Sequence, residues 1–307
     1  MEQIARDSTG LQTLNGDAEV FDVWDRDGEE EDAGEGADEG GFHLGIDLGT
    51  TNSCAAVWNL SKNRVKVVKV DGGHHTMPSV VMFDEGGDRS RPLVGRAAVH
   101  RSAGAGKGGA LLSSAKRLIG LQYDDPGVRA LLPQLPVEVR EDPDTGLAVI
   151  ALPGGGTVSP VEVSAAVMRE LKSGAEAWLA SRGGRLSGVS TPLEGCVITV
   201  PLRFPERRRR ATRDAARAAG FNKVATLGES TAAALAYGLL SAGKKKTVLV
   251  FDFGGGTLDV SLIEAEGGKL KVLSSAGDPA LGGDDMDQAL LSWLLRGLHE
   301  ALGMADG

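Results

Sequence analysis

Cysteine and aromatic residues are scarce in this sequence of 307 residues, and no long apolar run occurs. Its two cysteines, Cys54 and Cys196, lie far apart, which argues against a disulfide framework or a structural zinc site and favours a reducing compartment. No uninterrupted apolar stretch approaches the ~18 residues that a membrane span needs. The N-terminus is acidic and lacks the apolar block of a signal or transit peptide. We therefore expect a cytoplasmic or nuclear protein with no membrane partner.

Basic residues are almost absent from the first 41 positions, which hold 14 acidic and 2 basic side chains. This segment carries a net charge of −12, whereas residues 42–307 carry +3. Such a composition offers too little apolar surface to offset the entropy of ordering the chain. Residues 1–41 are therefore predicted to form an acidic disordered tail, which is either a plain solvated tail or an interaction arm.

Short strands, and then strands that alternate with helices, are predicted for the rest of the sequence. Apolar segments bounded by turn residues indicate strands, and segments with one apolar face indicate helices. Ser159-Pro160 marks the start of the longest predicted helix. The predicted strands cover residues 42–48, 54–60, 64–70, 79–83, 196–200, 247–253, 258–265 and 270–276, with others near Val137, Leu147 and Val224. A short helix is predicted to end in AKRLIG at residues 115–120, and helices are predicted to begin near Pro160, Pro205, Glu229 and Met286.

Two glycine-containing turns share one pattern. GIDLGTTN at residues 45–52 and DFGGGTLD at residues 252–259 each join two strands through an aspartate, a glycine and a threonine. Their first aspartates, Asp47 and Asp252, lie 205 positions apart, which favours two lobes built on one plan. Glycine lets an anion approach the backbone amides, and threonine hydroxyls add hydrogen bonds. The pair predicts a phosphate site, although either turn alone is more often a structural hairpin.

Carboxylates beside a phosphate site indicate a bound cation. Asp47, Asp252 and Asp259 would repel a phosphate directly, so they imply a cation or its waters between them and the anion. Mg²⁺ bound partly through water is the usual solution.

Two other motifs are interpreted as structural. GAGKGG at residues 104–109 lacks the first glycine and the final hydroxyl of the G-x-x-x-x-G-K-[ST] phosphate loop, so we interpret it as a surface loop. The four arginines at residues 207–210 have no interleaved aromatic residues for stacking on bases. They are interpreted as an exposed helix surface, and no nucleic-acid partner is expected.

Five blocks, in this order, resemble the signatures of the seventy-kilodalton heat-shock chaperones. Similarity runs from about Phe42 to the C-terminus through GIDLGTTNSC, VITVPLRF with RRATRDAARAAGF, GESTAAALAYGL, DFGGGTLDVSL and LGGDDMD. The resemblance implies an α/β fold, namely the two-lobed actin-like, ribonuclease-H-like ATPase with ATP and Mg²⁺ between the lobes. By family layout, residues 42–242 form a complete lobe I and residues 243–307 a partial lobe II. The residues that grip adenosine and a peptide-binding domain are not expected within this sequence.

The resemblance also implies roles for individual residues. The aspartates would orient Mg²⁺ and K⁺ and their waters, and Pro201 with Arg209 would relay the nucleotide state to a substrate domain. Without the resemblance, the simpler interpretations are that Pro201 ends a strand, that Arg209 is an exposed charge and that Glu229 caps a helix. The implied catalytic residues are Asp47, Glu229, Asp252 and Thr257; the phosphate-binding residues are Gly49, Thr50, Thr51, Asn52, Gly254, Gly255, Gly256 and Thr257; and the metal site is Asp47, Asp252 and Asp259.

The main departure from the family concerns its catalytic lysine. In the block VGRAAVHR we expect that lysine at the position of Val99, with His100, Arg101 or Lys107 as substitutes. Valine cannot donate to the γ-phosphate, and the loss of one such donor costs about 3–4 kcal/mol of transition-state stabilisation. Slow or absent hydrolysis is therefore expected. Glu229-Ser230-Thr231 also replaces Glu-Pro-Thr, which keeps the carboxylate.

Three functions are consistent with these features. The leading one is the ATP-binding domain of a heat-shock-type chaperone, for which the resemblance implies ATP or ADP, Mg²⁺ and K⁺ as ligands and J-domain co-chaperones and nucleotide exchange factors as partners. Unfolded polypeptide would bind only through a further domain. A non-hydrolysing nucleotide sensor is the second, favoured by Val99. An actin-like small-molecule kinase is the third, disfavoured by the blocks around Pro201 and Glu229. An uncovered sheet edge in lobe II also predicts low stability in isolation.

Overall fold

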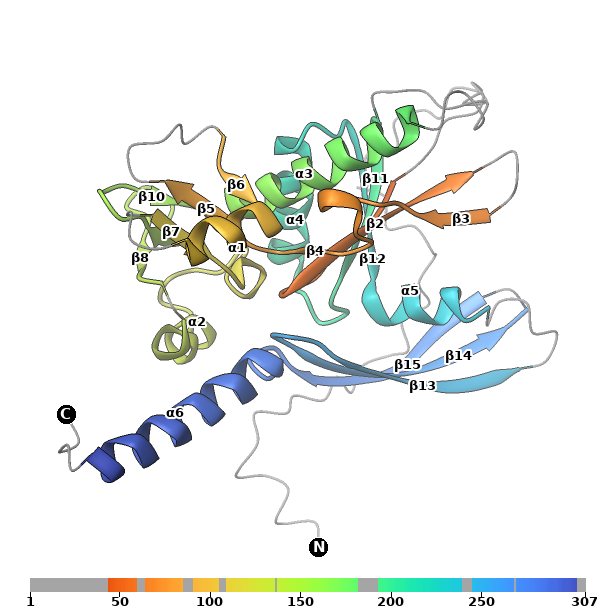
Figure 1. Cartoon of the computed structure of the whole chain (residues 1–307). Helices are drawn as coiled ribbons and strands as arrows, with labels where there is room; N and C mark the ends of the chain where they lie inside the picture. Colours follow the sequence, from red (N-terminus) through yellow and green to blue (C-terminus); the bar gives the residue numbers. More distant parts are fainter. Residues whose placement is uncertain are drawn as a thin grey trace, which may run out of the picture.

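The structure is a computed structural model and describes most of the chain after the N-terminal segment (Figure 1). The described residues are 44–59, 64–84, 91–104, 109–135, 137–181, 193–238, 245–267 and 269–302. The acidic tail at residues 1–41 and most of the Gly104–Gly109 loop, with Lys107, lie outside these ranges. What was expected of them stays a prediction.

A six-stranded mixed sheet is the centre of the larger part of the molecule (Figure 1). Its order is β12-β11-β1-β2-β3, with β4 paired to β2. β1 runs parallel to β11 and antiparallel to β2, so the carboxyl end of β1, which carries Asp47, lies beside the corresponding end of β11. The strands are β1 (Leu44–Leu48), β2 (Asn52–Asn59), β3 (Arg64–Val67), β4 (Met77–Pro78), β11 (Gly195–Val200) and β12 (Lys223–Gly228).

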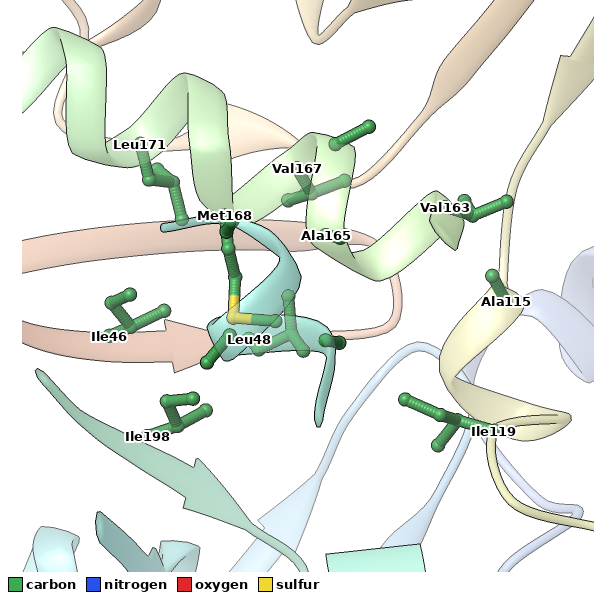
Figure 2. Packing of buried hydrophobic residues seen from close by; sticks show 14 of the residues in the cluster. Ile46, Leu48, Ala115, Ile119, Val163, Ala165, Val167, Met168, Leu171 and Ile198 are labelled. Atoms are coloured by element: carbon green, nitrogen blue, oxygen red, sulfur yellow. The ribbon is translucent and has the colours of Figure 1, made fainter. Parts of the chain in front are cut away.

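Helix α3 (Pro160–Ala180) covers this sheet and begins where the sequence predicts. Ser159 and Glu162 form a capping box, which satisfies free amide groups of the first turn. The buried face of α3 packs against β1, β2 and the neighbouring helix α4 (Glu206–Ala218). Figure 2 shows Met168 extending from α3 toward Leu48 of β1. Met168 is fully buried, so it belongs to the centre of the larger core.

Two small sheets extend this part of the molecule. The same stretch of chain contains two helices that the sequence patterns do not predict. β5 pairs with β6 and β7, and β9 pairs with β8 and β10. The unpredicted helices α1 and α2 are short, which explains why they give little periodic signal. The elements are β5 (Val81–Asp84), β6 (Leu93–Val94), α1 (Arg96–Ala103), β7 (Gly109–Leu112), α2 (Pro126–Leu131), β8 (Val139–Glu141), β9 (Ala148–Ala151) and β10 (Thr157–Val158), with single 3₁₀ turns η2 (Asp71–Gly73), η3 (Ala115–Arg117) and η4 (Leu132–Gln134).

A separate antiparallel sheet makes up the second part of the molecule. It consists of β13 (Lys246–Phe253), β14 (Leu258–Glu266) and β15 (Lys269–Asp278). Ala234 of α5 (Glu229–Ala236) joins Ile263, Ala265 and Leu270 in a second, smaller core. Figure 1 shows α5 between the two parts. The predicted α/β class is confirmed, whereas the lobe boundary at residue 242 stays a prediction.

Apolar surface is exposed on the second part. Phe251 of β13 is 65% exposed, and Trp293 of α6 (Gly283–Leu302) is 63% exposed. β13 pairs only with β14 among the described strands. Helix α6 extends away from the six-stranded sheet and from the sheet of β13, β14 and β15 (Figure 1). The low stability expected from an uncovered sheet edge stays a prediction. None of the described helices is both long and apolar enough to cross a membrane.

Replacing Met168 by alanine is expected to lower the free energy of unfolding by about 2–5 kcal/mol, because it leaves a cavity between α3 and the central sheet. Met286 in α6 is 57% exposed and provides the matched control, since Met286→Ala removes the same atoms without a buried cavity. Urea denaturation measures both variants. Equal losses in the two would contradict the assignment of Met168 to the core.

Candidate functional site

The two glycine-containing turns lie against each other. A Cβ atom added to Gly255 would be 1.8 Å from Thr51 Oγ1, and one added to Gly256 would be 2.7 Å from Thr50 Cγ2. The second turn therefore has no room for side chains where it faces the first. This arrangement brings together the residues expected to bind phosphate from sequence positions about 200 apart.

The first turn is tightly closed at the end of β1. A Cβ on Gly49 would lie 2.1 Å from the carbonyl oxygen of Asn52, so this position excludes larger residues. The Ser79 amide donates to the Thr51 carbonyl at 2.8 Å and attaches the turn to the chain after β4. Thr50 is buried, whereas Thr51 and Asn52 are exposed. Their side chains are thus accessible to a ligand at the turn.

The second turn is supported by the start of α6. The amide groups of Gly283 and Asp284 donate to the carbonyls of Gly254 and Gly255 at 3.0 and 2.8 Å. The Gly254 amide donates to the Thr257 carbonyl at 3.0 Å and closes the turn. A Cβ on Gly282 would lie 2.4 Å from the backbone of Gly255. The close approach of α6 to the second turn therefore depends on Gly282, a residue that the sequence patterns do not identify as part of the site.

Two aspartates stand directly opposite each other where β13 and β14 leave the second turn. Asp252 and Asp259 are register partners, so their side chains lie on the same face of the sheet. Asp259 is 6% exposed. Burial raises the pKa of both carboxyls. The charge of Asp252 raises the pKa of Asp259 further, and the charge of Asp47 raises the pKa of Asp252 further. Like charges in this position destabilise the sheet unless a cation lies between them.

The third predicted metal residue, Asp47, is exposed at the end of β1 and accepts a hydrogen bond from Thr199 Oγ1 of β11 at 2.9 Å. Within the described part of the chain, no three His, Cys, Asp or Glu side chains converge closely enough to enclose a metal ion. Mg²⁺ usually keeps several of its waters and takes only one or two carboxylates. The donor set therefore fits a hydrated Mg²⁺ held largely through water.

A cation that acts on both aspartates of the second turn is Lys116 of η3. Its Nζ atom lies 2.6 Å from Glu229 Oε1 at the start of α5, and the lysine is 8% exposed. Burial raises the pKa of Glu229, while the charge of Lys116 opposes that rise. The charge of Lys116 also lowers the pKa of Asp252 and of Asp259. One buried lysine thus acts on Glu229 and on both aspartates of the second turn.

The expectation that Val99 stands at the position of the family's catalytic lysine stays a prediction. Val99 is 39% exposed on α1, which packs against the small sheet of β5, β6 and β7, and His100 and Arg101 are exposed on the same helix. Lys116 lies in the segment AKRLIG, whose pattern predicts only a short helix. The sequence signal that could identify Lys116 is the Lys-Arg pair inside an otherwise apolar segment, because a buried charge requires a partner.

The interpretation of residues 207–210 as an exposed surface is wrong for two of the four arginines. Arg209 donates to the carbonyls of Leu202 and Phe204, both at 3.0 Å, and so holds the loop after Pro201. Arg208 is 6% exposed, and burial lowers its pKa to about 10. Arg207 and Arg210 are exposed, as expected.

A cavity of about 270 Å³ adjoins the second turn on the side of the Pro201 loop. Its lining comes from η3, the region of α2, the Pro201 loop with the start of α4, and the strands β14 and β15. It includes Arg117, Pro201, Thr257, Asp259 and Gly277. Thr257 and Asp259 therefore border both the second glycine turn and this cavity.

Two lobes whose strands end in aspartates, and whose glycine turns face each other, define a nucleotide-binding domain of the actin-like class. The Hsp70 protein family model matches residues 43–305, so the chain belongs to the Hsp70 family. It corresponds to the nucleotide-binding part of these heat-shock-type chaperones.

Curated relatives agree with this assignment. A heat shock cognate HSP70 protein of Trypanosoma brucei brucei is 40% identical over 268 residues, which are 86% of this chain and 37% of that protein. The chaperone protein HscA of Edwardsiella ictaluri (strain 93-146) is 40% identical over 262 residues, 85% of this chain and 38% of that protein. The chain thus spans less than two fifths of the length of these relatives.

Without Mg²⁺, Asp259→Asn is expected to raise the free energy of unfolding by up to about 1 kcal/mol, and so to raise the melting temperature, because it removes one of two opposed buried charges. The same substitution should abolish any stabilisation by Mg²⁺. Calorimetric melting with Mg²⁺ and with EDTA measures both effects. A variant that melts lower than wild type in EDTA, and is still stabilised by Mg²⁺, would show that no cation balances this pair.

Gly282→Ala is expected to weaken phosphate binding by roughly tenfold or more, because its Cβ has no space against the backbone of Gly255 and must displace the turn. Gly297 in α6 is the control, since a Cβ there meets nothing within 4 Å. Titration calorimetry with ADP and Mg²⁺ gives the affinities. Unchanged affinity in Gly282→Ala would separate α6 from the site.

Proposed function

We propose that this chain binds the phosphates of ATP and ADP with Mg²⁺ between its two glycine turns, and that it serves as the ATP-hydrolysing domain of a protein-folding chaperone. The single observation that supports this most is the close contact of the two turns beside the opposed pair Asp252 and Asp259. Such a site presents backbone amides to an anion and carboxylates to a cation at one place. A nucleotide phosphate with its metal satisfies both.

The turns would divide the phosphate chain between them. The proposed donors are the amide groups of residues 49–52, 255 and 256 and the hydroxyls of Thr50, Thr51 and Thr257. Asp47, Asp252 and Asp259 would hold Mg²⁺, and a K⁺ ion in the finer proposal, mainly through waters. A bound Mg²⁺ would neutralise negative charge on the phosphate oxygens.

Lys116 and Glu229 are the proposed catalytic pair. The Lys116 ammonium group has three donors, of which Glu229 accepts one, so others remain for an oxygen of the γ-phosphate. Glu229 is buried next to this lysine, where its free carboxylate oxygen can orient an attacking water for in-line displacement. The transition state loses stabilisation if the buried cation is removed.

The other two functions are not favoured. The sensor interpretation depended on Val99, whereas we propose that Lys116, which is buried against Glu229, is the lysine of the site. Membership in the Hsp70 family disfavours a small-molecule kinase. J-domain co-chaperones and nucleotide exchange factors are the partners we propose, with a cytoplasmic or nuclear location. The carbonyl contacts of Arg209 support a role of the Pro201 loop in relaying the nucleotide state.

Lys116→Met is expected to slow single-turnover ATP hydrolysis by on the order of 100- to 1000-fold, because it removes the only lysine among the site residues described above. Val99→Lys is the control and should leave the rate unchanged, since that position lies on the exposed side of α1. Rapid-quench measurement with excess protein gives both rates.

An increase of the rate in Val99→Lys would restore the sensor interpretation. Hydrolysis that is unaffected in Lys116→Met would contradict the role of this lysine.

A further inference from the structure

Two polar contacts join η3, which carries Lys116, to the start of α6. Ser114 Oγ donates to Asp284 Oδ2 at 2.8 Å, and Arg117 Nη2 donates to Asp285 Oδ1 at 2.9 Å. The Arg117 side chain is 3% exposed and that of Asp285 is 15% exposed, so solvent screens this ion pair little. The two contacts enclose Lys116 in the sequence, one on each side.

The acidic residues of these contacts also build the support of the second turn. Asp285 Oδ2 accepts from the Gly282 amide at 2.7 Å and caps α6, while the Asp284 amide donates to the Gly255 carbonyl. Each aspartate therefore holds η3 through its side chain and belongs to the segment that fixes the phosphate-facing glycines. A displacement of α6 must move the second turn and the partners of η3 together.

On its other side, η3 is attached to α4. Arg208 Nη2 donates to the Lys116 carbonyl at 2.7 Å and Nε donates to the Ile119 carbonyl at 3.1 Å. The guanidinium group of Arg208 stacks on Phe204 at 3.8 Å. These bonds fix the backbone of Lys116 to the first part of the molecule, so this backbone moves relative to the second turn only when the two parts move.

The backbone at the start of η3 indicates that its position is imposed. Ser114 has φ 54° and ψ 22°, a left-handed conformation that is uncommon for serine. Such conformations persist where surrounding contacts hold them. The partner that Ser114 reaches with its hydroxyl is Asp284 of the other lobe.

We propose that Ser114 and Arg117, together with Asp284 and Asp285, form an interlobe latch that positions Lys116 for catalysis only when α6 and the second turn are docked. The four residues are positioning residues, because none of them is assigned to the reacting atoms. The inference rests on the proposed ATP hydrolysis for its functional part. The coupling of η3 to α6 can be measured without hydrolysis.

The test uses Asp285→Asn and Ser114→Ala in the protein. Asparagine keeps an oxygen that can cap α6 but removes the charge that pairs with Arg117. The measurements are single-turnover ATP hydrolysis, ADP affinity by calorimetry and hydrogen–deuterium exchange of residues 114–121. Arg207→Gln is the control, because it breaks an exposed ion pair with Asp125 that does not reach η3.

Asp285→Asn is expected to slow hydrolysis by on the order of 10- to 100-fold, as for a misplaced catalytic group. ADP affinity should stay within about twofold, since a positioning contact acts on the rate more than on binding. Exchange at residues 114–121 should become faster in Asp285→Asn and, to a smaller extent, in Ser114→Ala. The Arg207→Gln control should match wild type in all three measurements.

The proposal is overturned if exchange at residues 114–121 is unchanged in both variants, or if ADP affinity falls in parallel with the rate. If wild type hydrolyses no ATP, the proposed hydrolysis fails, and the exchange measurement still decides whether η3 is coupled to α6. If Asp285→Asn does not fold, Ser114→Ala alone is compared with wild type, because this substitution removes only one buried hydroxyl.

Discussion

The contact between the two glycine turns is the constraint on which the rest of this structure depends. Gly255 and Gly256 can lie against Thr51 and Thr50 only because they have no side chains. The strands that end in these turns, the helix that supports the second turn and the position of η3 all follow from that approach. A phosphate site that draws backbone amides from both lobes requires this close approach.

Charge is the second constraint, and it explains why a lysine is buried here. Asp252, Asp259 and Glu229 each have a raised pKa, caused first by burial, and Lys116 is the cation that opposes this in all three. The charge of Arg203 also lowers the pKa of Asp259, but two cations leave these three carboxylates with an excess of negative charge. The site is therefore suited to a further cation, which arrives most simply together with a phosphate chain.

Much of the fold could be predicted from the sequence, because long periodic segments and the Ser159 capping box are local signals. The pairing of the two turns could be predicted from their repeated pattern. Lys116 and its partners could not, since no local rule places η3 between Glu229 and α6. The burial of Arg208 was missed for the same reason, as its partners are carbonyls 89 to 92 positions away.

Binding of inorganic triphosphate by titration calorimetry, with Mg²⁺ and with EDTA, tests the central claim most directly, because this ligand has no adenosine and depends on the turns and the cation alone. The account predicts saturable binding with Mg²⁺ that is lost in EDTA. Binding of equal strength in EDTA, or no binding under either condition, would contradict a joint phosphate and Mg²⁺ site between the two turns.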